Sequence, residues 1–286
     1  MIARRWILTA VLVAAACTDE VEVGANNPLI GSGGSAGSDA APECVPAIRQ
    51  GHSYQCGDCI DNDQDGLIDA ADPECLGPWD DTEETFYGGD MPNSTPCRQD
   101  CYFDSDSGSG NDECYWSHRC DPRSRAPDYP PSADARCDYD PSAMIPGISA
   151  SCADLAASQP ERCQQACQPL TPNGCDCFGC CELPYGSGQH VWLGSAENGV
   201  GTCDLAHVGD PLKCRPCTPV EGCFNPCEPC EVCVGRSPGE PGPCVDGGQQ
   251  VPQPCGAGGT PCGREGQAQC GPNQYCITGC CVTIPS

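Results

Sequence analysis

The chain has 286 residues and a formal net charge of −27 at pH 7, and it contains 31 cysteines, 35 glycines and 30 prolines. So large a negative charge argues against binding to nucleic acid and against electrostatic attraction to anionic lipid. With only 4 Phe, 4 Trp and 3 Met, the chain lacks the side chains of an ordinary core, and its cysteine content is typical of a disulfide scaffold. We therefore expect a small disulfide-rich fold, mostly irregular, with short helices and strands and little regular secondary structure.

Residues 1–16 are predicted to be a cleaved export signal. A basic start precedes an apolar run from Trp6 to Val13, which is shorter than the roughly 20 residues of a membrane-spanning helix. Three alanines followed by Cys17 resemble the lipobox of bacterial lipoproteins. This resemblance implies a diacylglyceryl thioether on Cys17, and Thr18 after it favours the outer membrane or cell surface. The alternative is cleavage after Ala16 that leaves Cys17 as a spare thiol.

The other thirty cysteines lie between Cys44 and Cys281, and this even set can close as up to fifteen disulfides. Four Cys-x-x-Cys groups occur among them, a spacing that in a cytosolic protein would indicate zinc sites or redox centres. Behind an export signal we expect disulfides instead. The groups are Cys56/Cys59, Cys177/Cys180, Cys214/Cys217 and Cys227/Cys230/Cys233.

Composition also divides the chain into segments. Residues 17–43 have the composition of a flexible linker, here between a lipid anchor and a folded part. Residues 44–233 form a cysteine-rich body, 234–254 a second linker rich in proline and glycine, and 255–286 a C-terminal module with six cysteines. Twenty-four cysteines lie from Cys44 to Cys244 and six from Cys255 to Cys281, so each of these two sets can pair internally.

Regular structure is expected to be short and local. Residues 151–154 resemble a capping box that opens a helix ending before Pro160, and Pro160 fits the first position of a second helix. In that second helix, Cys163 and Cys167 fall four residues apart on one face. Residues 190–193 are the best strand candidate, and turns are predicted at 172–174, 198–199 and 225–226.

The strongest chemical motif is the segment 61–72, which reads DNDQDGLIDAAD. Carboxylates at alternate positions put oxygens on one side of a tight loop, Gly66 permits a sharp turn, and Ile68 is expected to pack the loop down. This is the ligand order of an EF-hand loop, with aspartate in place of the final glutamate. We expect calcium to bind here, because calcium takes carboxylate and carbonyl oxygens; without an ion the segment would be a hydrated acidic turn. The expected ligands are Asp61, Asp63, Asp65, the carbonyl of Leu67, Asp69 and Asp72.

Cysteines bracket this loop, with Cys56 and Cys59 before it and Cys75 after it. A disulfide from either of the first two to Cys75 would clamp the ends of the loop without flanking helices. In this respect the segment resembles thrombospondin type 3 repeats more than EF-hand sensors. We expect an affinity in the extracellular range, roughly 10⁻⁴–10⁻³ M, and a stabilising role.

Weaker signals follow the loop. Residues 104–113 alternate oxygen-bearing side chains but lack a third carboxylate and an apolar packing residue, so they could be a second site, lend ligands to the first, or form a polar loop. Tyr115 and Trp116 could stack on a sugar ring or pack against disulfides. The four histidines form no pair at metal-binding or catalytic spacing, and no nucleophile elbow, His-Glu-x-x-His motif or phosphate loop occurs. We nominate no catalytic residue and expect no enzyme.

Three segments, 56–69, 97–104 and 170–181, are similar to cysteine-rich lipoproteins and secreted proteins predicted in myxobacteria. That resemblance implies a surface location and calcium, without an assigned activity. The tail pattern over 275–281 resembles small knotted modules and the cysteine-rich region of Dickkopf-like proteins.

Together these features predict a lipid-anchored, calcium-stabilised, disulfide-rich protein that acts as a binding or structural module, with a protein or carbohydrate partner at the cell surface. One alternative is an extracellular protease inhibitor that uses the C-terminal module. Another is a hydrolase with an unrecognised site, which would need a deep pocket lined by converging polar side chains.

Overall fold

The structure is a computed structural model, which describes residues 44–49, 51–88, 97–104, 112–123, 137–145, 148–228, 231–236, 255, 259–262 and 269–283. The predicted signal peptide and Cys17 lie outside the described residues, as do residues 17–43 and 237–254 of the two predicted linkers.

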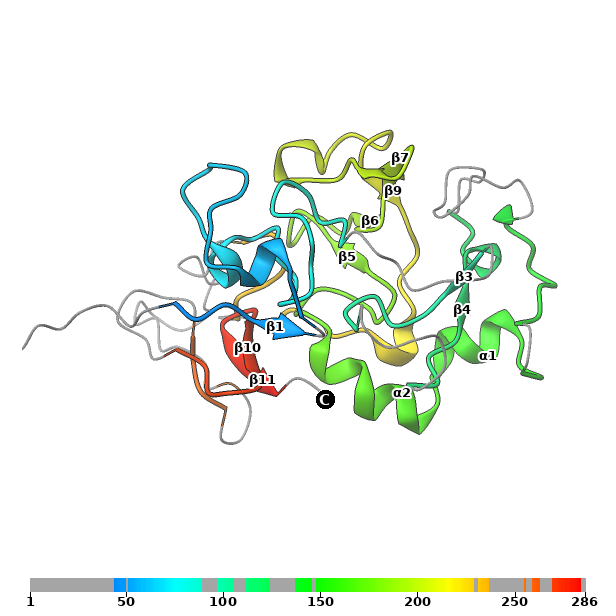
Figure 1. Ribbon diagram of the computed structural model, residues 1–286. Coiled ribbons are helices and arrows are strands. Elements are labelled where there is room, and N and C mark those ends of the chain that lie inside the picture. The colour runs from blue at the N-terminus through cyan, green and yellow to red at the C-terminus, as the bar shows by residue number, and fades with distance from the viewer. Residues whose placement is uncertain are drawn as a thin grey trace, which may run out of the picture. The chain divides into compact units, whose positions relative to one another are not determined.

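Regular elements are short, as predicted, and long stretches without regular structure join them (Figure 1). The α-helices of the described chain are α1 (Cys152–Ala157) and α2 (Glu161–Ala166). Single 3₁₀ turns supplement them: η1 (Gln55–Gly57), η2 (Asp69–Ala71), η3 (His118–Cys120), η5 (Gln168–Leu170), η6 (Leu205–His207) and η7 (Glu221–Cys223).

The strands pair antiparallel in small sheets. A three-stranded sheet has the order β5 (Cys180–Glu182), β6 (His190–Trp192) and β9 (Arg215–Pro216). The two-stranded pairs are β1 (Ile48–Arg49) with β2 (His52–Ser53), β3 (Arg98–Gln99) with β4 (Trp116–Ser117), β7 (Ala196–Glu197) with β8 (Val200–Gly201), and β10 (Gln274–Ile277) with β11 (Cys280–Thr283). The predicted strand at 190–193 is therefore the central strand β6.

The predicted capping box is present at the start of α1. The Ser151 side chain accepts a hydrogen bond from the Asp154 N–H at 3.2 Å, and the Asp154 carboxylate accepts one from the Ser151 N–H at 3.2 Å. Pro160 is the N-cap of α2, one position earlier than predicted. The turn at 198–199 has positive φ angles at Asn198 (54°) and Gly199 (80°), which suits the tight connection of β7 to β8.

Disulfides supply much of the interior. Cysteines are the most numerous of the buried hydrophobic residues, and few large side chains accompany them, such as Phe178 with Trp116 stacked on it at a centroid distance of 6.0 Å. Thirteen disulfides join described residues: 44–59, 56–75, 97–137, 101–167, 114–163, 120–152, 175–181, 180–217, 203–214, 227–233, 255–280, 262–276 and 270–281. Cys163 and Cys167, on one face of α2, thus fix that helix through two bonds. None of the described Cys-x-x-Cys pairs closes on itself.

The six tail cysteines bond only to one another, which agrees with the parity of the sequence. The module nevertheless packs on the body. The Tyr275 side chain is 9% exposed, and its hydroxyl donates to the Cys56 carbonyl oxygen at 2.9 Å. Ile277 belongs to the same buried cluster as Phe178. The tail and the body therefore share one core.

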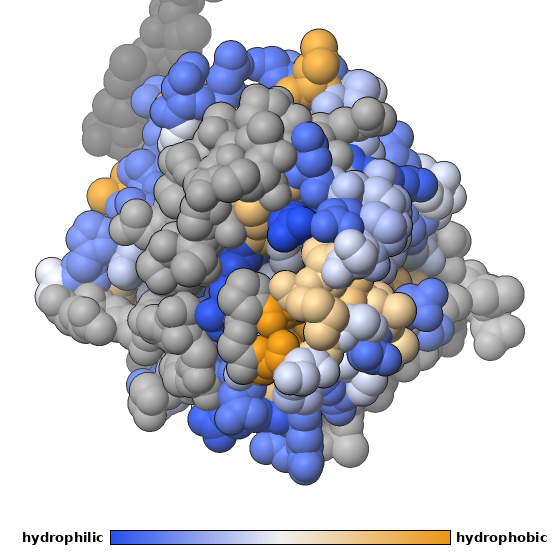
Figure 2. All heavy atoms as spheres, turned by 90° about the vertical axis from the view of Figure 1, so that its right-hand side faces the viewer, coloured by the Kyte–Doolittle hydropathy of each residue, from blue (hydrophilic) through white to orange (hydrophobic). Residues whose placement is uncertain are grey.

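On the face shown in Figure 2, most of the described residues are hydrophilic, and hydrophobic ones form a patch near the centre, with a few more at the top and the left. Exposed hydrophobic side chains include those of Val45, Val200 and Leu212. Among the residues described here, no helix has the length and apolar character needed to cross a membrane.

One buried histidine makes stability sensitive to acid. His118 is 5% exposed, and its ring lies edge-on to Trp192 with the centroids 4.7 Å apart. Burial lowers the pKa of His118 well below its usual 6.5, and the nearby charge of Arg215 lowers it further. The folded protein therefore keeps this imidazole neutral at pH values where the unfolded chain protonates it.

We predict that the free energy of unfolding decreases as the pH falls from 7 to 5, in part because the unfolded chain protonates His118 and the folded protein does not. The contribution of His118 is complete above 6.5 and falls by up to about 1.4 kcal/mol per pH unit below it. Denaturant unfolding of His118→Phe should show a weaker dependence on pH over this range than the parent. The control is His52→Phe, because the His52 side chain is 58% exposed. Equal slopes in the parent and in His118→Phe would contradict the prediction.

Candidate metal centre

The first half of the predicted calcium loop brings three carboxylates together. Oxygens of Asp61, Asp63 and Asp65 all lie within 4.8 Å of one another. Calcium–oxygen distances are about 2.3–2.6 Å, so oxygens on opposite sides of one ion are at most about 5 Å apart. The spacing of the three oxygens therefore fits a single calcium ion.

Backbone geometry explains why these side chains converge. The chain turns sharply through Gln64 (φ 67°) and Gly66 (φ 99°), and the second of these angles favours glycine, as predicted. The Asp61 carboxylate accepts hydrogen bonds from the N–H groups of both residues, at 2.6 and 3.1 Å. Asp63 accepts from the Asp65 N–H at 3.0 Å, and Asp65 accepts from the Leu67 N–H at 2.7 Å. Each aspartate thus holds the next part of the turn while facing its neighbours.

Asp69 departs from the predicted arrangement. Its carboxylate lies against the backbone N–H of Cys59, at 3.1 and 3.2 Å, and not with the three carboxylates of the first half. The reason is local, because Asp69 begins the 3₁₀ turn η2 with a positive φ of 47°. Burial raises the pKa of Asp69 to about 6 against the lowering effect of the Cys59 N–H, and the charges of Glu83 and Asp58 raise it further.

Asp72, the last predicted ligand, is buried. It is 2% exposed, and its Oδ1 accepts a hydrogen bond from the Glu74 N–H at 2.7 Å. Its Oδ2 is buried without a hydrogen-bond partner. Burial raises the pKa of Asp72, and the charges of Glu74 and Asp65 add to this effect. A cation would stabilise this buried oxygen, which has no hydrogen-bond partner and is repelled by the charge of Asp65.

Two other expectations for the loop have different outcomes. Ile68 was expected to pack the loop down, but it is 44% exposed, and Leu67 beside it is only partly buried. The expectation for Ile68 is wrong because the following turn η2, not an apolar contact, redirects the chain. The Leu67 carbonyl as a ligand stays a prediction.

Glu83 is a functional candidate that the sequence pattern missed. It is fully buried (0% exposed), and its carboxylate accepts the N–H groups of Asn62 at 2.5 Å and Asp69 at 2.9 Å. It therefore ties together the second and ninth positions of the loop. An oxygen of Glu83 also lies within 4.8 Å of an oxygen of Asp72. The only sequence signal was the acidic run at 80–84, because no spacing rule connects it to the loop.

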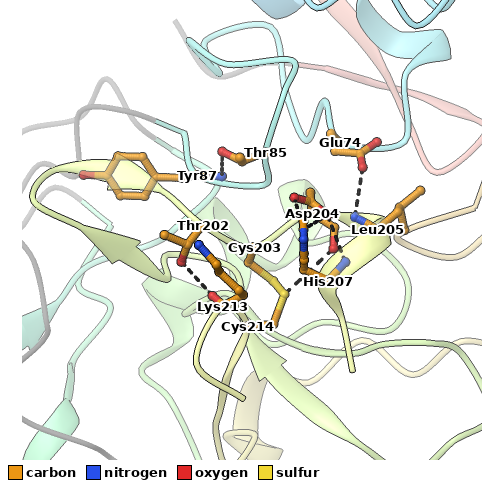
Figure 3. Close-up of polar contacts among 10 residues, drawn as sticks. All are labelled: Glu74, Thr85, Tyr87, Thr202, Cys203, Asp204, Leu205, His207, Lys213 and Cys214. Atoms are coloured by element: carbon orange, nitrogen blue, oxygen red, sulfur yellow. Dashed lines mark hydrogen bonds and ion pairs between the residues drawn. A yellow bond between two sulfur atoms is a disulfide. The ribbon is translucent and has the colours of Figure 1, made fainter. Parts of the chain in front are cut away.

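The end of the loop is fastened to a distant segment. The Glu74 carboxylate accepts the Leu205 N–H at 3.0 Å (Figure 3). The Phe86 N–H donates to the Cys203 carbonyl oxygen at 2.9 Å, and the disulfide from Cys203 to Cys214 braces that second segment (Figure 3). The cysteine clamp is also present, since Cys56 bonds to Cys75 across the loop.

Uncompensated charge dominates this region. Residues 58–83 contain ten acidic residues and neither lysine nor arginine. An exposed ion pair from outside, His52 with Asp81 at 3.9 Å, is too weak to offset such an excess. The loop therefore offers carboxylate oxygens, a backbone already turned around them, and no positive side chain of its own.

The possible second metal site and the possible sugar-binding aromatic residue are both largely buried where the structure describes them. Residues 105–111 of the stretch 104–113 lie outside the described residues, while Asp104 and Asp112 are buried. Asp112 lies beside Asp100, and burial together with that neighbouring charge raises the pKa of Asp100 to about 7. Trp116 is 5% exposed and packs on Phe178, so its ring is not available to a sugar in this structure.

No protein-family model, curated protein or solved structure matches this chain.

We predict that Glu83→Gln destabilises the protein by about 2 kcal/mol or more, and weakens any ion binding by the loop. A glutamine amide has one acceptor oxygen, so one of the two buried N–H groups would face a donor. Thermal unfolding with the disulfides intact measures this loss. Glu84→Gln is the matched control, because Glu84 is the exposed neighbour. Equal stability of the two variants would show that Glu83 does not hold the loop.

Proposed function

We propose that this protein is lipid-anchored at Cys17, stabilised by calcium at the loop 61–72, and acts as a binding or structural module at the outer membrane or cell surface. Its dense disulfides indicate an extracellular protein, since such bonds persist in oxidising compartments.

A single observation carries the calcium proposal. Three carboxylates are held with their oxygens within 4.8 Å of one another, and the sequence around them has no positive side chain to neutralise them. Asp61, Asp63 and Asp65 would hold the ion, with Asp72 and the Leu67 carbonyl as further ligands. A bound calcium ion would supply positive charge to this region. Because the loop is clamped by a disulfide, the ion would stabilise a preformed turn, not switch a conformation.

The proposed role is non-catalytic. The anchor proposal depends on the three alanines before Cys17, and the partner is proposed to be a protein or a carbohydrate at the same surface. The acidic surface would favour a partner with basic groups, because complementary charge assists encounter.

We predict that calcium raises the melting temperature of the exported chain carrying Cys17→Ser. With an affinity of about 10⁻⁴–10⁻³ M, 10 mM calcium would add roughly 1.4–2.7 kcal/mol of stability, or about 3–10 °C. Asp63→Ala/Asp65→Ala should lose this rise, because two of the three clustered carboxylates are gone. Differential scanning calorimetry with calcium and with a chelator measures both effects.

The matched control is Glu84→Ala/Asp138→Ala. This variant removes the same charge from two exposed positions outside the loop, so it should keep the rise caused by calcium. An equal rise in both double variants would mean that calcium acts elsewhere. If calcium does not raise the melting temperature of the parent, the loop is a charged turn that binds no stabilising ion.

We predict that the exported wild-type protein partitions into the detergent phase of a Triton X-114 extract, whereas Cys17→Ser stays in the aqueous phase. The thioether needs the cysteine sulfur, and serine cannot replace it. Thr18→Ser retains Cys17 and serves as the control. Mass spectrometry of the N-terminal peptide identifies the modification. Recovery of the wild-type protein in the aqueous phase with an unmodified Cys17 would contradict the anchor.

A further inference from the structure

Two buried cysteines are unbonded in a chain where disulfides are otherwise the rule. Among the described residues, Cys177 and Cys223 are the cysteines outside a disulfide. They are 0% and 1% exposed, and both belong to the main buried cluster. The even number of cysteines after Cys17 allows every one of them to pair, so this unbonded pair needs an explanation.

The fold places the two cysteines on neighbouring segments. Cys175 and Asn225 form an isolated antiparallel bridge, in which the Asn225 N–H donates to the Cys175 carbonyl oxygen at 2.8 Å. Cys177 follows Cys175 by two residues, and Cys223, the last residue of η7, precedes Asn225 by two. The bridge therefore holds both cysteines close to the point where the two segments meet.

The two residues are in direct contact. The Cys177 N–H donates to the Cys223 sulfur at 3.3 Å, and the Cys177 sulfur lies 3.5 Å from the Cys223 carbonyl oxygen. Burial raises the pKa of the Cys223 thiol, and contact with the Cys177 side chain raises it further. The Cys223 thiol is therefore a poor nucleophile and a poor metal ligand, because both roles need the thiolate.

The neighbourhood holds the two segments in place. The Asp176 carboxylate accepts the N–H groups of Phe178 and Cys180 from its own segment, both at 2.9 Å, and that of Val220 from the other segment at 2.7 Å. Gly222 lies so close to α1 that an added Cβ would be 2.6 Å from the Ser158 Cα. The alignment of Cys177 with Cys223 is thus built into the fold.

We propose that Cys177 and Cys223 form a further disulfide in the exported protein. The alternative, a redox-active dithiol, is disfavoured because a partner disulfide could not reach either sulfur in the folded state. Closure belongs to folding, when the segments are still accessible. One cysteine thiolate attacks the disulfide of a protein oxidant in the export compartment and forms a mixed disulfide. The second cysteine thiolate then attacks the sulfur of the first cysteine and displaces the thiolate of the donor. The donor leaves as a dithiol carrying both electrons and both protons.

The test counts free thiols in the exported chain carrying Cys17→Ser. The protein is unfolded in guanidinium without reductant, alkylated with N-ethylmaleimide, and weighed intact by mass spectrometry. Cys177→Ala is compared with this parent. If the disulfide exists, removing Cys177 frees Cys223, and the variant gains one adduct. If both are thiols in the parent, the variant loses one adduct, and the proposal is overturned.

Cys203→Ala is the matched control, because Cys203 is bonded to Cys214, and it should also gain one adduct. Should Cys177→Ala fail to fold, the parent alone decides the matter through a non-reducing peptide map. A linked fragment that contains Cys177 and Cys223 supports the proposal. Recovery of both residues as alkylated thiols rejects it.

Discussion

Covalent cross-linking is the constraint on which the rest of this structure depends. The helices have six residues each, and the longest strands of the described chain have four, so these elements would not persist alone in water. Disulfides restrict the unfolded chain, each contributing roughly 2–4 kcal/mol, and more for longer loops. The bond from Cys101 to Cys167 spans 66 residues and fixes α2, which shows how distant segments are drawn into one core.

This source of stability permits an unusual distribution of charge. An ordinary core would be disrupted by carboxylates as deeply buried as Asp72 and Glu83. Here the bonds from Cys44 to Cys59 and from Cys56 to Cys75 hold the surrounding backbone. The acidic loop can therefore keep its turn despite repulsion among its side chains. Cross-linking and the proposed calcium ion address different problems: the bonds oppose chain entropy, and the ion would oppose charge repulsion.

Packing, and not cross-linking, joins the C-terminal module to the body. The tail cysteines pair among themselves, yet Tyr275 buries its ring and donates its hydroxyl to the carbonyl of Cys56, a cysteine that clamps the acidic loop. A partner that binds the tail would thus contact a module joined to the loop region through this core. The linker between them separates the two parts in the sequence, whereas packing joins them.

The sequence by itself determined the features that arise from nearby residues: the fold class, the capping box at Ser151, the strand at 190–193, and the convergence of the carboxylates between Asp61 and Asp65. Hydrogen bonds and turn chemistry over a few residues specify these. Only the tertiary structure decided which cysteines pair and how Glu83 reaches the loop. Such contacts join segments that no local period connects, because any cysteine or carboxylate can physically serve several partners until the chain is folded.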